Sequence, residues 1–423
     1  MTIAAQMRKI AQDAKAASRR LASAEGSARQ QALLNMAELL GQSGPAIFAA
    51  NKKDLDAARK NGLDSAKLDR LTISQGVLDS MIQGCREVAA MSDPVGEIEG
   101  MKKRPNGMLV GRMRVPLGVV AMIFESRPNA AVDAAVLCIK SGNAAILRGG
   151  SEAFHSIKAL TKVVHQALEA AGLPKGCVQV PPTTDREAVS ALLKLDEYID
   201  VVIPRGGEGL IRAVVEQASM PVLKHYKGVC HTFVDASADL ERAVLIIHNA
   251  KVQRPGTCNS LECLLVHQAV AKKLLPKVAK KLGEAGVEFR CCKASLALMG
   301  PHTEGVAKAA VKTDWGFEFL GLTLAVKVVA DLDEALEHIA QYGSNHTEAI
   351  LTESHANAMR FTREADASMV AVNASTRLND GGELGLGAEV GISTTKLHAY
   401  GPMGVRELTS AKFVVLGQGQ IRS

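Results

Sequence analysis

Residues 118–147, GVVAMIFESRPNAAVDAAVLCIKSGNAAIL, decide the fold of this chain. The apolar run over 118–124 predicts a buried strand, Val132 to Lys140 predict an apolar helix, and 144–147 predict a second strand. Strand, helix and strand in this order are typical of a βαβ unit with parallel strands. The same alternation continues through helices over 159–171 and 186–193 and strands over 178–180 and 201–203. It predicts a doubly wound α/β sheet.

Helical patterns fill the first hundred residues, and a second α/β pattern follows the first. Between them, 96–116 is punctuated by Gly and Pro, and its alternating part predicts a protruding hairpin suited to an oligomer contact. Later helices over 270–283, 332–342 and 356–364 alternate with strands over 325–329, 349–351 and 368–372, before a terminal strand over 414–416. We expect a cofactor-binding domain over 1–250, a catalytic domain over 251–375, and a C-terminal segment over 376–423 that returns to the cofactor or oligomerisation region.

Composition excludes several classes of function. A formal net charge of +6 over 423 residues, with 3% aromatic residues, disfavours nucleic-acid binding and suits a small anionic ligand. No run approaches the roughly 18 apolar residues that span a bilayer, and no compact signal core opens the chain, so no membrane association and a cytoplasmic location are expected. The eight cysteines lack C-x-x-C spacing, which indicates neither a metal site nor disulfides.

One cysteine, Cys258, lies in an unusual loop, Gln253-Arg-Pro-Gly-Thr-Cys-Asn-Ser260, between a predicted helix and a predicted strand. A thiol on such a bend can approach a substrate carbonyl, while nearby backbone N–H groups face the developing oxyanion. Unpaired cysteines are more often small core residues, and Cys263, inside the strand, fits that alternative. The polar, turn-forming neighbours of Cys258 favour a nucleophile.

Two loops follow predicted strands with an arginine and two glycines. Either loop alone could be an ordinary tight turn, because neither matches G-x-G-x-x-G. Together they predict an anion-binding edge, where backbone N–H groups and arginines hold a phosphate. The absence of a ribose-binding acid favours NADP over NAD. The candidate cofactor residues are Arg148, Gly149, Gly150 and Ser151 in the first loop and Arg205, Gly206 and Gly207 in the second.

Several long motifs resemble one family, the gamma-glutamyl phosphate reductases (glutamate-5-semialdehyde dehydrogenases) of the aldehyde dehydrogenase-like superfamily, over essentially the full chain. These motifs occupy 115–120, 123–129, 140–153, 203–207, 253–259, 372–377 and 385–398. The resemblance implies a Rossmann-type cofactor domain, an α/β catalytic domain and a small oligomerisation element in a homo-oligomer. It also implies NADPH-dependent reduction of L-glutamyl 5-phosphate to L-glutamate 5-semialdehyde, the second step of proline biosynthesis. The labile acyl phosphate makes a glutamate 5-kinase a chemically sensible partner.

In that reaction Cys258 would form a thioester, and the Cys258 and Asn259 region would supply oxyanion donors. Hydrolytic relatives carry a glutamate base in a segment comparable to 223–231, which here holds Lys224, His225 and Lys227 and no carboxylate. That composition favours phosphate over water and suggests that His225 or Lys224 lies near the phosphate, although a histidine capping a strand end is an equal alternative.

The α-carboxylate and α-ammonium of the substrate require complementary groups. The candidates are Arg127, Asn129, Arg377 and His398, each of which could instead have a structural role. Tyr400 departs from the family pattern, in which an arginine follows Leu-His-Ala. Two alternatives stay open: a hydrolytic NAD(P)-dependent aldehyde dehydrogenase, and an inactive relative that binds NADP.

Overall fold

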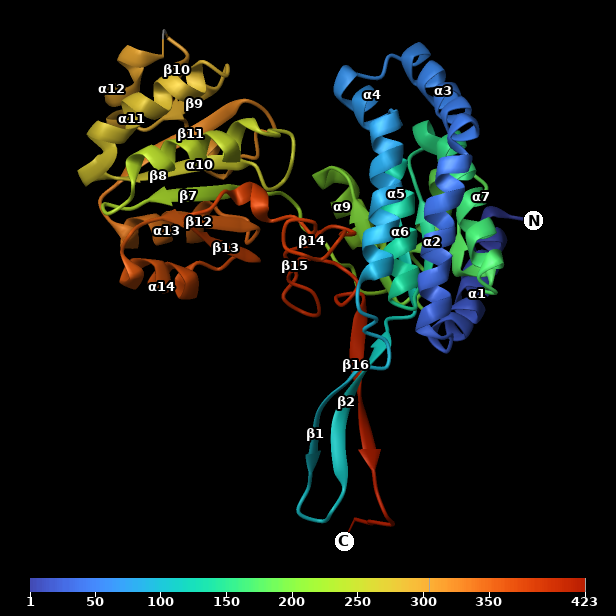
Figure 1. Ribbon diagram of the computed structural model, residues 1–423. Helices are drawn as coiled ribbons and strands as arrows, with labels where there is room; N and C mark the ends of the chain where they lie inside the picture. The colour runs from blue at the N-terminus through green and yellow to red at the C-terminus, as the bar shows by residue number, and fades with distance from the viewer. Residues whose placement is uncertain (304, 423) are drawn as a thin grey trace. The chain divides into compact units, whose positions relative to one another are not determined.

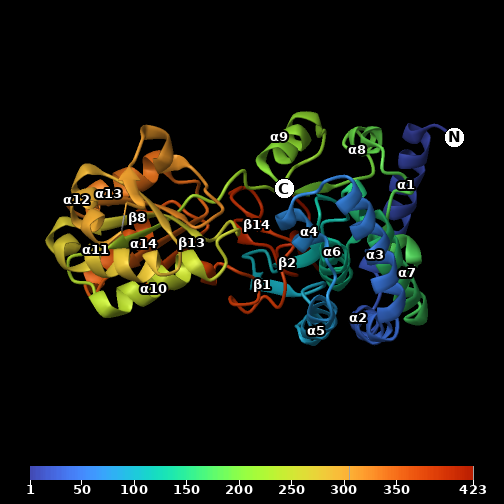
Figure 2. The ribbon, with the colours of Figure 1, turned by 90° about the horizontal axis from the view of Figure 1, so that it is seen from above.

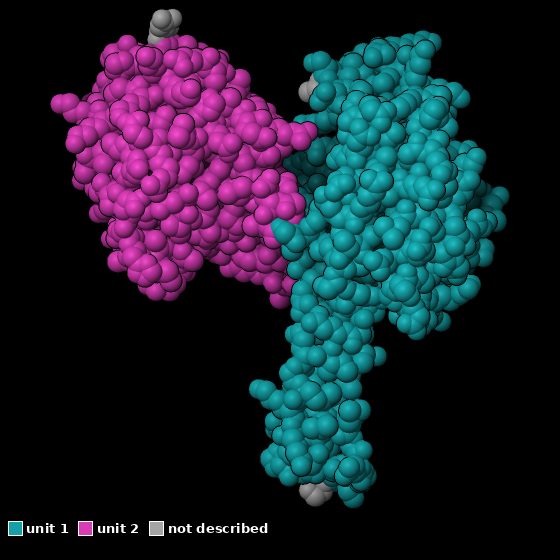
Figure 3. Space-filling model, viewed as in Figure 1, with its two compact units in different colours: residues 1–224, 385–391, 402–423 teal, residues 225–384, 392–401 magenta. Residues whose placement is uncertain are grey.

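The computed structural model describes residues 1–303 and 305–422 and divides the chain into two compact units (Figure 3). Unit 1 comprises 1–224, 385–391 and 402–423, and unit 2 comprises 225–384 and 392–401. The boundary that we expected at residue 250 therefore falls at 225. Strand β7 (Cys230–Val234) pairs with β8 (Leu261–His267), and helix α10 (Leu240–Val252) packs on the same core, so both belong to unit 2.

Unit 1 is built around a parallel four-stranded sheet of order β5-β4-β3-β6. Its strands are β3 (Val119–Phe124), β4 (Ala144–Arg148), β5 (Val178–Gln179) and β6 (Val201–Arg205). Its helices are α1 (Ile3–Ala22), α2 (Gly26–Gln42), α3 (Gly44–Lys60), α4 (Ser65–Leu71), α5 (Gln75–Ala90), α6 (Asn129–Lys140), α7 (Phe154–Ala170), α8 (Arg186–Leu192) and α9 (Glu208–Gln217). Every residue of β3 is buried, which is typical of a parallel strand covered on both faces. The predicted βαβ alternation is confirmed.

The register of this sheet aligns the ends of three strands. Ile123 pairs with Arg148, and Phe124 pairs with Arg205, so the loops that follow β3, β4 and β6 leave the same edge. This is the carboxyl edge, where open α/β sheets bind ligands. The two arginine-glycine loops therefore leave the same edge, as the sequence predicts, with the loop after β3 between them.

A separate antiparallel sheet of unit 1 extends away from its helices (Figure 1). It consists of β1 (Ile98–Lys103), β2 (Leu109–Pro116) and β16 (Thr409–Leu416), in that order. The predicted hairpin thus gains a third strand from the C-terminal part of the chain. Phe413 is 69% exposed, and Ile98 and Val415 are also exposed, so this sheet carries an uncovered apolar surface. Among the described helices, none is long and apolar enough to cross a membrane.

Unit 2 contains a seven-stranded sheet of order β10-β9-β11-β8-β7-β12-β13, whose neighbouring strands are all parallel. Besides β7 and β8, its strands are β9 (Glu288–Cys291), β10 (Ala307–Ala309), β11 (Thr323–Val329), β12 (Thr347–Leu351) and β13 (Met369–Val372). Its helices besides α10 are α11 (Gln268–Gly283), α12 (Lys293–Met299), α13 (Leu332–Tyr342) and α14 (His355–Glu364). Two short strands, β14 (Ile392–Ser393) and β15 (Gly401–Pro402), pair near its end.

Helices cover both faces of this sheet (Figure 2). Apolar residues of α10, α11 and α12 pack with one set of strand side chains, which includes Leu264. Residues of α13 and α14 pack with the opposite set, which includes Phe233 and Leu265. Strands β7, β9 and β10 and helix α12 are additions to the predicted elements.

Candidate active site

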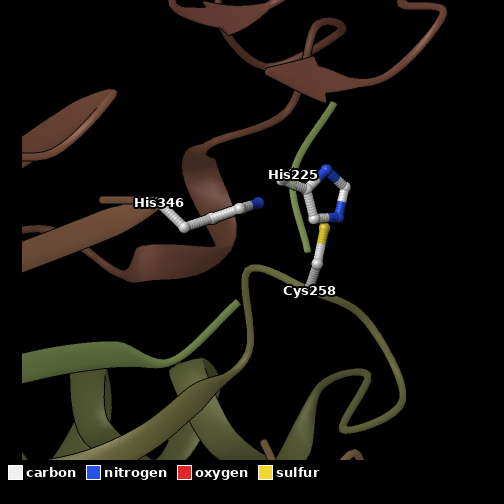
Figure 4. Close-up of side chains that lie close together, drawn as sticks. All are labelled: His225, Cys258 and His346. Carbon is white, nitrogen blue, oxygen red and sulfur yellow. The ribbon is translucent and has the colours of Figure 1, made fainter. Parts of the chain in front are cut away.

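Three loops of unit 2 converge at the amino ends of adjacent parallel strands. Residues 225–229 precede β7, residues 253–260 precede β8, and His346 immediately precedes β12. The strand order β8-β7-β12 makes these loops neighbours. It brings Cys258, His225 and His346 together, with one ligand atom of each side chain within 4.8 Å of the others (Figure 4).

The loop of Cys258 lies against the segment that carries His225. A Cβ added to Gly228 would lie 1.9 Å from the carbonyl oxygen of Cys258, so only glycine fits at this crossing. The thiol of Cys230 donates to the same carbonyl at 3.1 Å, and the Thr257 hydroxyl donates to the carbonyl of Arg254 at 2.8 Å. These contacts hold the backbone of the bend that carries the Cys258 side chain.

The two histidine rings are each held through Nδ1. Nδ1 of His225 donates to the carbonyl oxygen of Ile392 at 2.7 Å, so Nε2 of the neutral ring is an acceptor. His346 is fully buried, and its Nδ1 lies 2.7 Å from the hydroxyl of Thr347. Nε2 of His346 has no hydrogen-bond partner among the described residues. Figure 4 shows the His346 ring pointing toward Cys258 and His225.

The histidines set the charge of the thiol. Burial opposes the thiolate, but the charges and hydrogen bonds of His346 and His225 outweigh it and hold the pKa of Cys258 well below its ordinary value. By contrast, burial raises the pKa of Cys85 and of Cys138 to about 12. Cys258 is also half-exposed, whereas those two are buried. A depressed thiol pKa with solvent access is typical of a nucleophile.

The side chain of Asn259 holds the loop of Cys258 in place and is not available to stabilise an oxyanion. Its buried amide nitrogen donates to the carbonyls of Asn379, at 2.9 Å, and of Arg377, and its Oδ1 accepts from the Arg377 guanidinium. Arg377 also donates to Gln253 at 2.8 Å, so it contacts both ends of the Cys258 loop. The backbone N–H groups of Cys258 and Asn259 donate no hydrogen bond within the described part of the chain, which leaves them free to face an oxyanion.

A carboxyl group does approach the site, from a part of the sequence distant from 223–231. Glu318 accepts the backbone N–H of Gly228 at 2.8 Å, and burial together with the nearby Cys258 charge raises its pKa. Behind the loop, Lys251 and Glu262 form a fully buried ion pair at 2.7 Å. Glu262 also accepts the N–H of Leu320 at 3.2 Å, which ties the segment after Glu318 to β8.

The predicted cofactor residues lie together at the carboxyl edge of the unit 1 sheet. The Arg148 guanidinium donates to the carbonyl of Thr184 at 2.8 Å, and its Nε is buried without a partner among the described residues. A Cβ on Gly149 would meet Cδ1 of Ile157 at 2.1 Å and the Phe124 ring at 2.9 Å, so a larger residue there would require these side chains to shift. A small cavity opens beside Arg148, lined by residues of 147–157 and 180–184.

The turn after β3 connects both loops. Glu125 accepts the N–H of Gly207 at 3.0 Å, and the hydroxyl of Ser126 donates to Glu152 at 2.6 Å. Ser126 adopts a φ of 38°, an uncommon left-handed conformation for a serine. The loop residues Gly150, Ser151, Arg205 and Gly206 line this same edge.

The predicted substrate residues are spread over both units. In unit 1, Arg127 is half-buried, and Asn129 donates to Asp133 at 3.2 Å. Burial raises the pKa of that Asp133 carboxyl to about 6, against the opposing charge of Arg205. In unit 2, His398 is exposed, with a φ of 78°, and Tyr400 donates to Asp366 at 3.2 Å. Of the predicted substrate residues in unit 2, His225 lies beside the Cys258 thiol.

His346 and Glu318 were not identified from the sequence. His346 comes directly before a predicted apolar strand, and in a parallel sheet the residues before neighbouring strands meet at one edge. Using that signal requires the order of the strands in the sheet, which the sequence pattern does not give. Glu318 follows Trp315-Gly-Phe317, a stretch without helical or strand periodicity, and offers no comparable signal.

Known proteins resemble this chain in sequence and in fold. The model of the aldehyde dehydrogenase family matches residues 2–312. The chain is 62% identical to the gamma-glutamyl phosphate reductase of Maridesulfovibrio salexigens over 99% of both chains, and 55% identical to that of Meiothermus ruber over the full length of both. The crystal structure of the Thermotoga maritima gamma-glutamyl phosphate reductase is similar, with a TM-score of 0.95 at 44% identity, covering 99% of this chain and 100% of that one.

The match to the Meiothermus ruber reductase covers both units, including the loop of Cys258. The resemblance read from the sequence motifs is therefore confirmed. This chain belongs to the aldehyde dehydrogenase family and, within it, to the gamma-glutamyl phosphate reductases.

Proposed function

We propose that the protein reduces L-glutamyl 5-phosphate to L-glutamate 5-semialdehyde with NADPH and releases inorganic phosphate, the second step of proline biosynthesis from glutamate. One observation carries the proposal: the Cys258 thiol lies close to both His225 and His346 at the amino edge of the unit 2 sheet. The names of the similar reductases supply the substrate.

The chemistry begins with the Cys258 thiolate. It attacks the acyl carbonyl, the carbon–oxygen bond to phosphate breaks, and phosphate leaves with the electron pair of that bond. His225 accepts the thiol proton at Nε2, because its Nδ1 proton is committed to Ile392. The free N–H groups of Cys258 and Asn259 stabilise the oxyanion, while Arg377 and the Asn259 side chain keep the loop in place.

NADPH, when bound, supplies the hydride that reduces the thioester. The resulting thiohemiacetal oxyanion of Cys258 collapses to the aldehyde and returns the thiolate. The edge formed by 148–151 and 205–207 fits such a dinucleotide, since Arg148 has a buried Nε without a partner among the described residues and borders a small cavity. We assign the NADP phosphates to this edge, with Arg148 and Arg205 as their cationic partners.

Substrate recognition is assigned to Arg127, Asn129 and His225, with His398 as a further candidate. Arg377 is reassigned to holding the nucleophile loop, because its guanidinium is already paired with Gln253 and Asn259. The cationic side chain of Arg127 is assigned to the α-carboxylate of the substrate. Asn129 donates to the carboxyl of Asp133, and this pair is assigned to the α-ammonium.

Two further proposals concern the setting of the enzyme. The exposed apolar side chains of the β1-β2-β16 sheet are assigned to a homo-oligomer interface, which light scattering and a Phe413→Glu variant would test.

A cytoplasmic glutamate 5-kinase is assigned as the source of the short-lived acyl phosphate. Faster semialdehyde formation from glutamate in a mixture with that kinase than from free acyl phosphate would support direct transfer.

The deciding experiment is the reverse reaction, in which glutamate 5-semialdehyde reduces NADP in the presence and absence of inorganic phosphate. The proposal requires phosphate dependence, acyl phosphate as product, and a preference for NADP over NAD. Equal rates without phosphate, with free glutamate as product, would show a hydrolytic dehydrogenase with Glu318 as its candidate base. No reaction under either condition, with NADP still bound, would show an inactive relative.

A further inference from the structure

Two clusters of two histidines and one cysteine lie in unit 2 among the described residues. One contains His225, Cys258 and His346, and the other contains His231, Cys263 and His338. In each cluster one ligand atom per residue lies within 4.8 Å of the others. Imidazole nitrogen and thiolate sulfur are the ligands that zinc takes in proteins. The spacing of these residues in the sequence gave no sign of either cluster, because each draws on three separate segments.

The second cluster is closed. All three of its residues are buried, and the Cys263 sulfur lies 3.6 Å from Nε2 of His338. His231 is held by Glu348, whose carboxylate lies 3.0 Å from both the ring Nδ1 and the backbone nitrogen. Nε2 of His231 lacks a partner among the described residues, as Nε2 of His346 does. The two clusters therefore offer the same types of ligand atom and differ in their access to solvent. A hydrated ion cannot enter without opening the core.

The first cluster is accessible to solvent through two of its three residues. His225 and Cys258 are half-exposed, and the buried His346 has an unpartnered Nε2 whose ring points toward Cys258 (Figure 4). Each ring is held at Nδ1, by the carbonyl of Ile392 for His225 and at the hydroxyl of Thr347 for His346. An outer hydrogen bond of this kind fixes the orientation of metal-binding histidines.

The dimensions fit a tetrahedral ion. With Zn–S near ~2.3 Å and Zn–N near ~2.0 Å, the ligand atoms of such a site lie about 3.5 Å apart. The ligand atoms here lie within 4.8 Å of one another, so small rotations of the half-exposed side chains close the difference. Three protein ligands leave a fourth position for water.

We propose that His225, Cys258 and His346 form a reversible binding site for zinc and similar thiophilic divalent ions, and that the bound ion blocks the nucleophile. The ion forms bonds to the Cys258 sulfur and to two ring nitrogens, and the proton shared by the thiol and the rings is released to solvent. No electron is transferred. The blocking of turnover rests on the proposed function, whereas binding of the ion does not.

The test uses the full chain, reduced and freed of metal with a chelator, and titrated with Co²⁺ as a spectroscopic probe and Zn²⁺ as its competitor. Wild type and the control Cys263→Ala should bind one ion with a thiolate-to-cobalt charge-transfer band. Cys258→Ser should lose that band. His346→Gln and His225→Gln each remove a direct ligand and should bind at least tenfold more weakly, because even the loss of an outer partner weakens metal binding roughly 10–100-fold.

A second measurement follows alkylation of Cys258 by iodoacetamide, read by peptide mass. At a zinc concentration about ten times its Kd, labelling should slow about tenfold, and a chelator should restore it. A band that survives in Cys258→Ser but disappears in Cys263→Ala would overturn the proposal, as would labelling that zinc leaves unchanged. Neither measurement needs substrate, so turnover in metal-free buffer tests the proposed function separately.

Discussion

Replacing His346 by glutamine should raise the pH at which Cys258 becomes reactive. One imidazolium charge at the outer limit of 4.8 Å from the sulfur interacts with a thiolate by about 3.5 kcal/mol at an effective dielectric of about 20. That energy corresponds to roughly 2.5 pH units for a full charge, and to about one unit where His346 and His225 share one proton. We expect the midpoint to move upward by about 1–2.5 pH units.

The assay is the rate of iodoacetamide labelling of Cys258 between about pH 5 and 9, because only the thiolate reacts. In the double variant of His346 and His225 the midpoint should rise above the ordinary thiol value of about 8.5, because burial opposes the thiolate once both histidines are gone. The midpoint is the quantity to compare, since a more basic thiolate is also a stronger nucleophile and partly offsets its lower population at a single pH. His355→Gln, an exposed histidine at the start of α14, is the matched control.

An unchanged midpoint in both single variants and in the double variant would refute the electrostatic reasoning. A fall in rate at every pH with no shift of the midpoint would mean that the substitution had moved the loop of Cys258 instead.

The remaining predictions address the loop, the core and the cofactor edge. Gly228→Ala places a methyl group on the Cys258 carbonyl and should lower kcat about 100-fold while NADPH binding persists, as measured by turnover and cofactor titration; full turnover would show that the crossing relaxes freely. Lys251→Met removes the counter-ion of the buried Glu262 and should lower the free energy of unfolding by about 3–5 kcal/mol in urea, whereas adding Glu262→Leu should recover most of that loss; an undiminished loss in the double variant would contradict this. Arg148→Ala should raise KM for NADPH about tenfold relative to NADH in initial-rate kinetics, and equal changes for both would remove Arg148 from the 2′-phosphate.

The core of unit 1 could be predicted because its sequence signals are local. Residues 119–124 are buried at every position and read as an unbroken apolar run, and the arginine-glycine loops directly follow such runs. Parallel pairing then requires the loops to share an edge. The Cys258 bend was likewise visible from its polar, turn-forming neighbours.

The partners of Cys258 depend on contacts between distant segments. Strand β7 was missed because its sequence, Cys-His-Thr-Phe-Val, contains two adjacent polar residues, His231 and Thr232, although all five residues are buried. His231 is accommodated there by its contact with Glu348. His346 joins the site because β12 lies beside β7, a strand order that periodicity does not specify. The buried amide of Asn259 is occupied by residues more than a hundred positions away, so its loop-holding role could not be inferred locally.

The attachment of His225 to Ile392 limits how this protein can be cut into fragments. The chain leaves unit 2 after Leu384, contributes 385–391 to unit 1, and then returns with Ile392. A recombinant fragment that stops at Leu384 would keep all seven strands of the large sheet and yet lack the carbonyl that fixes the His225 tautomer. Any truncated version of the catalytic unit therefore has to continue to Gly401, with 385–391 retained as a bridging peptide.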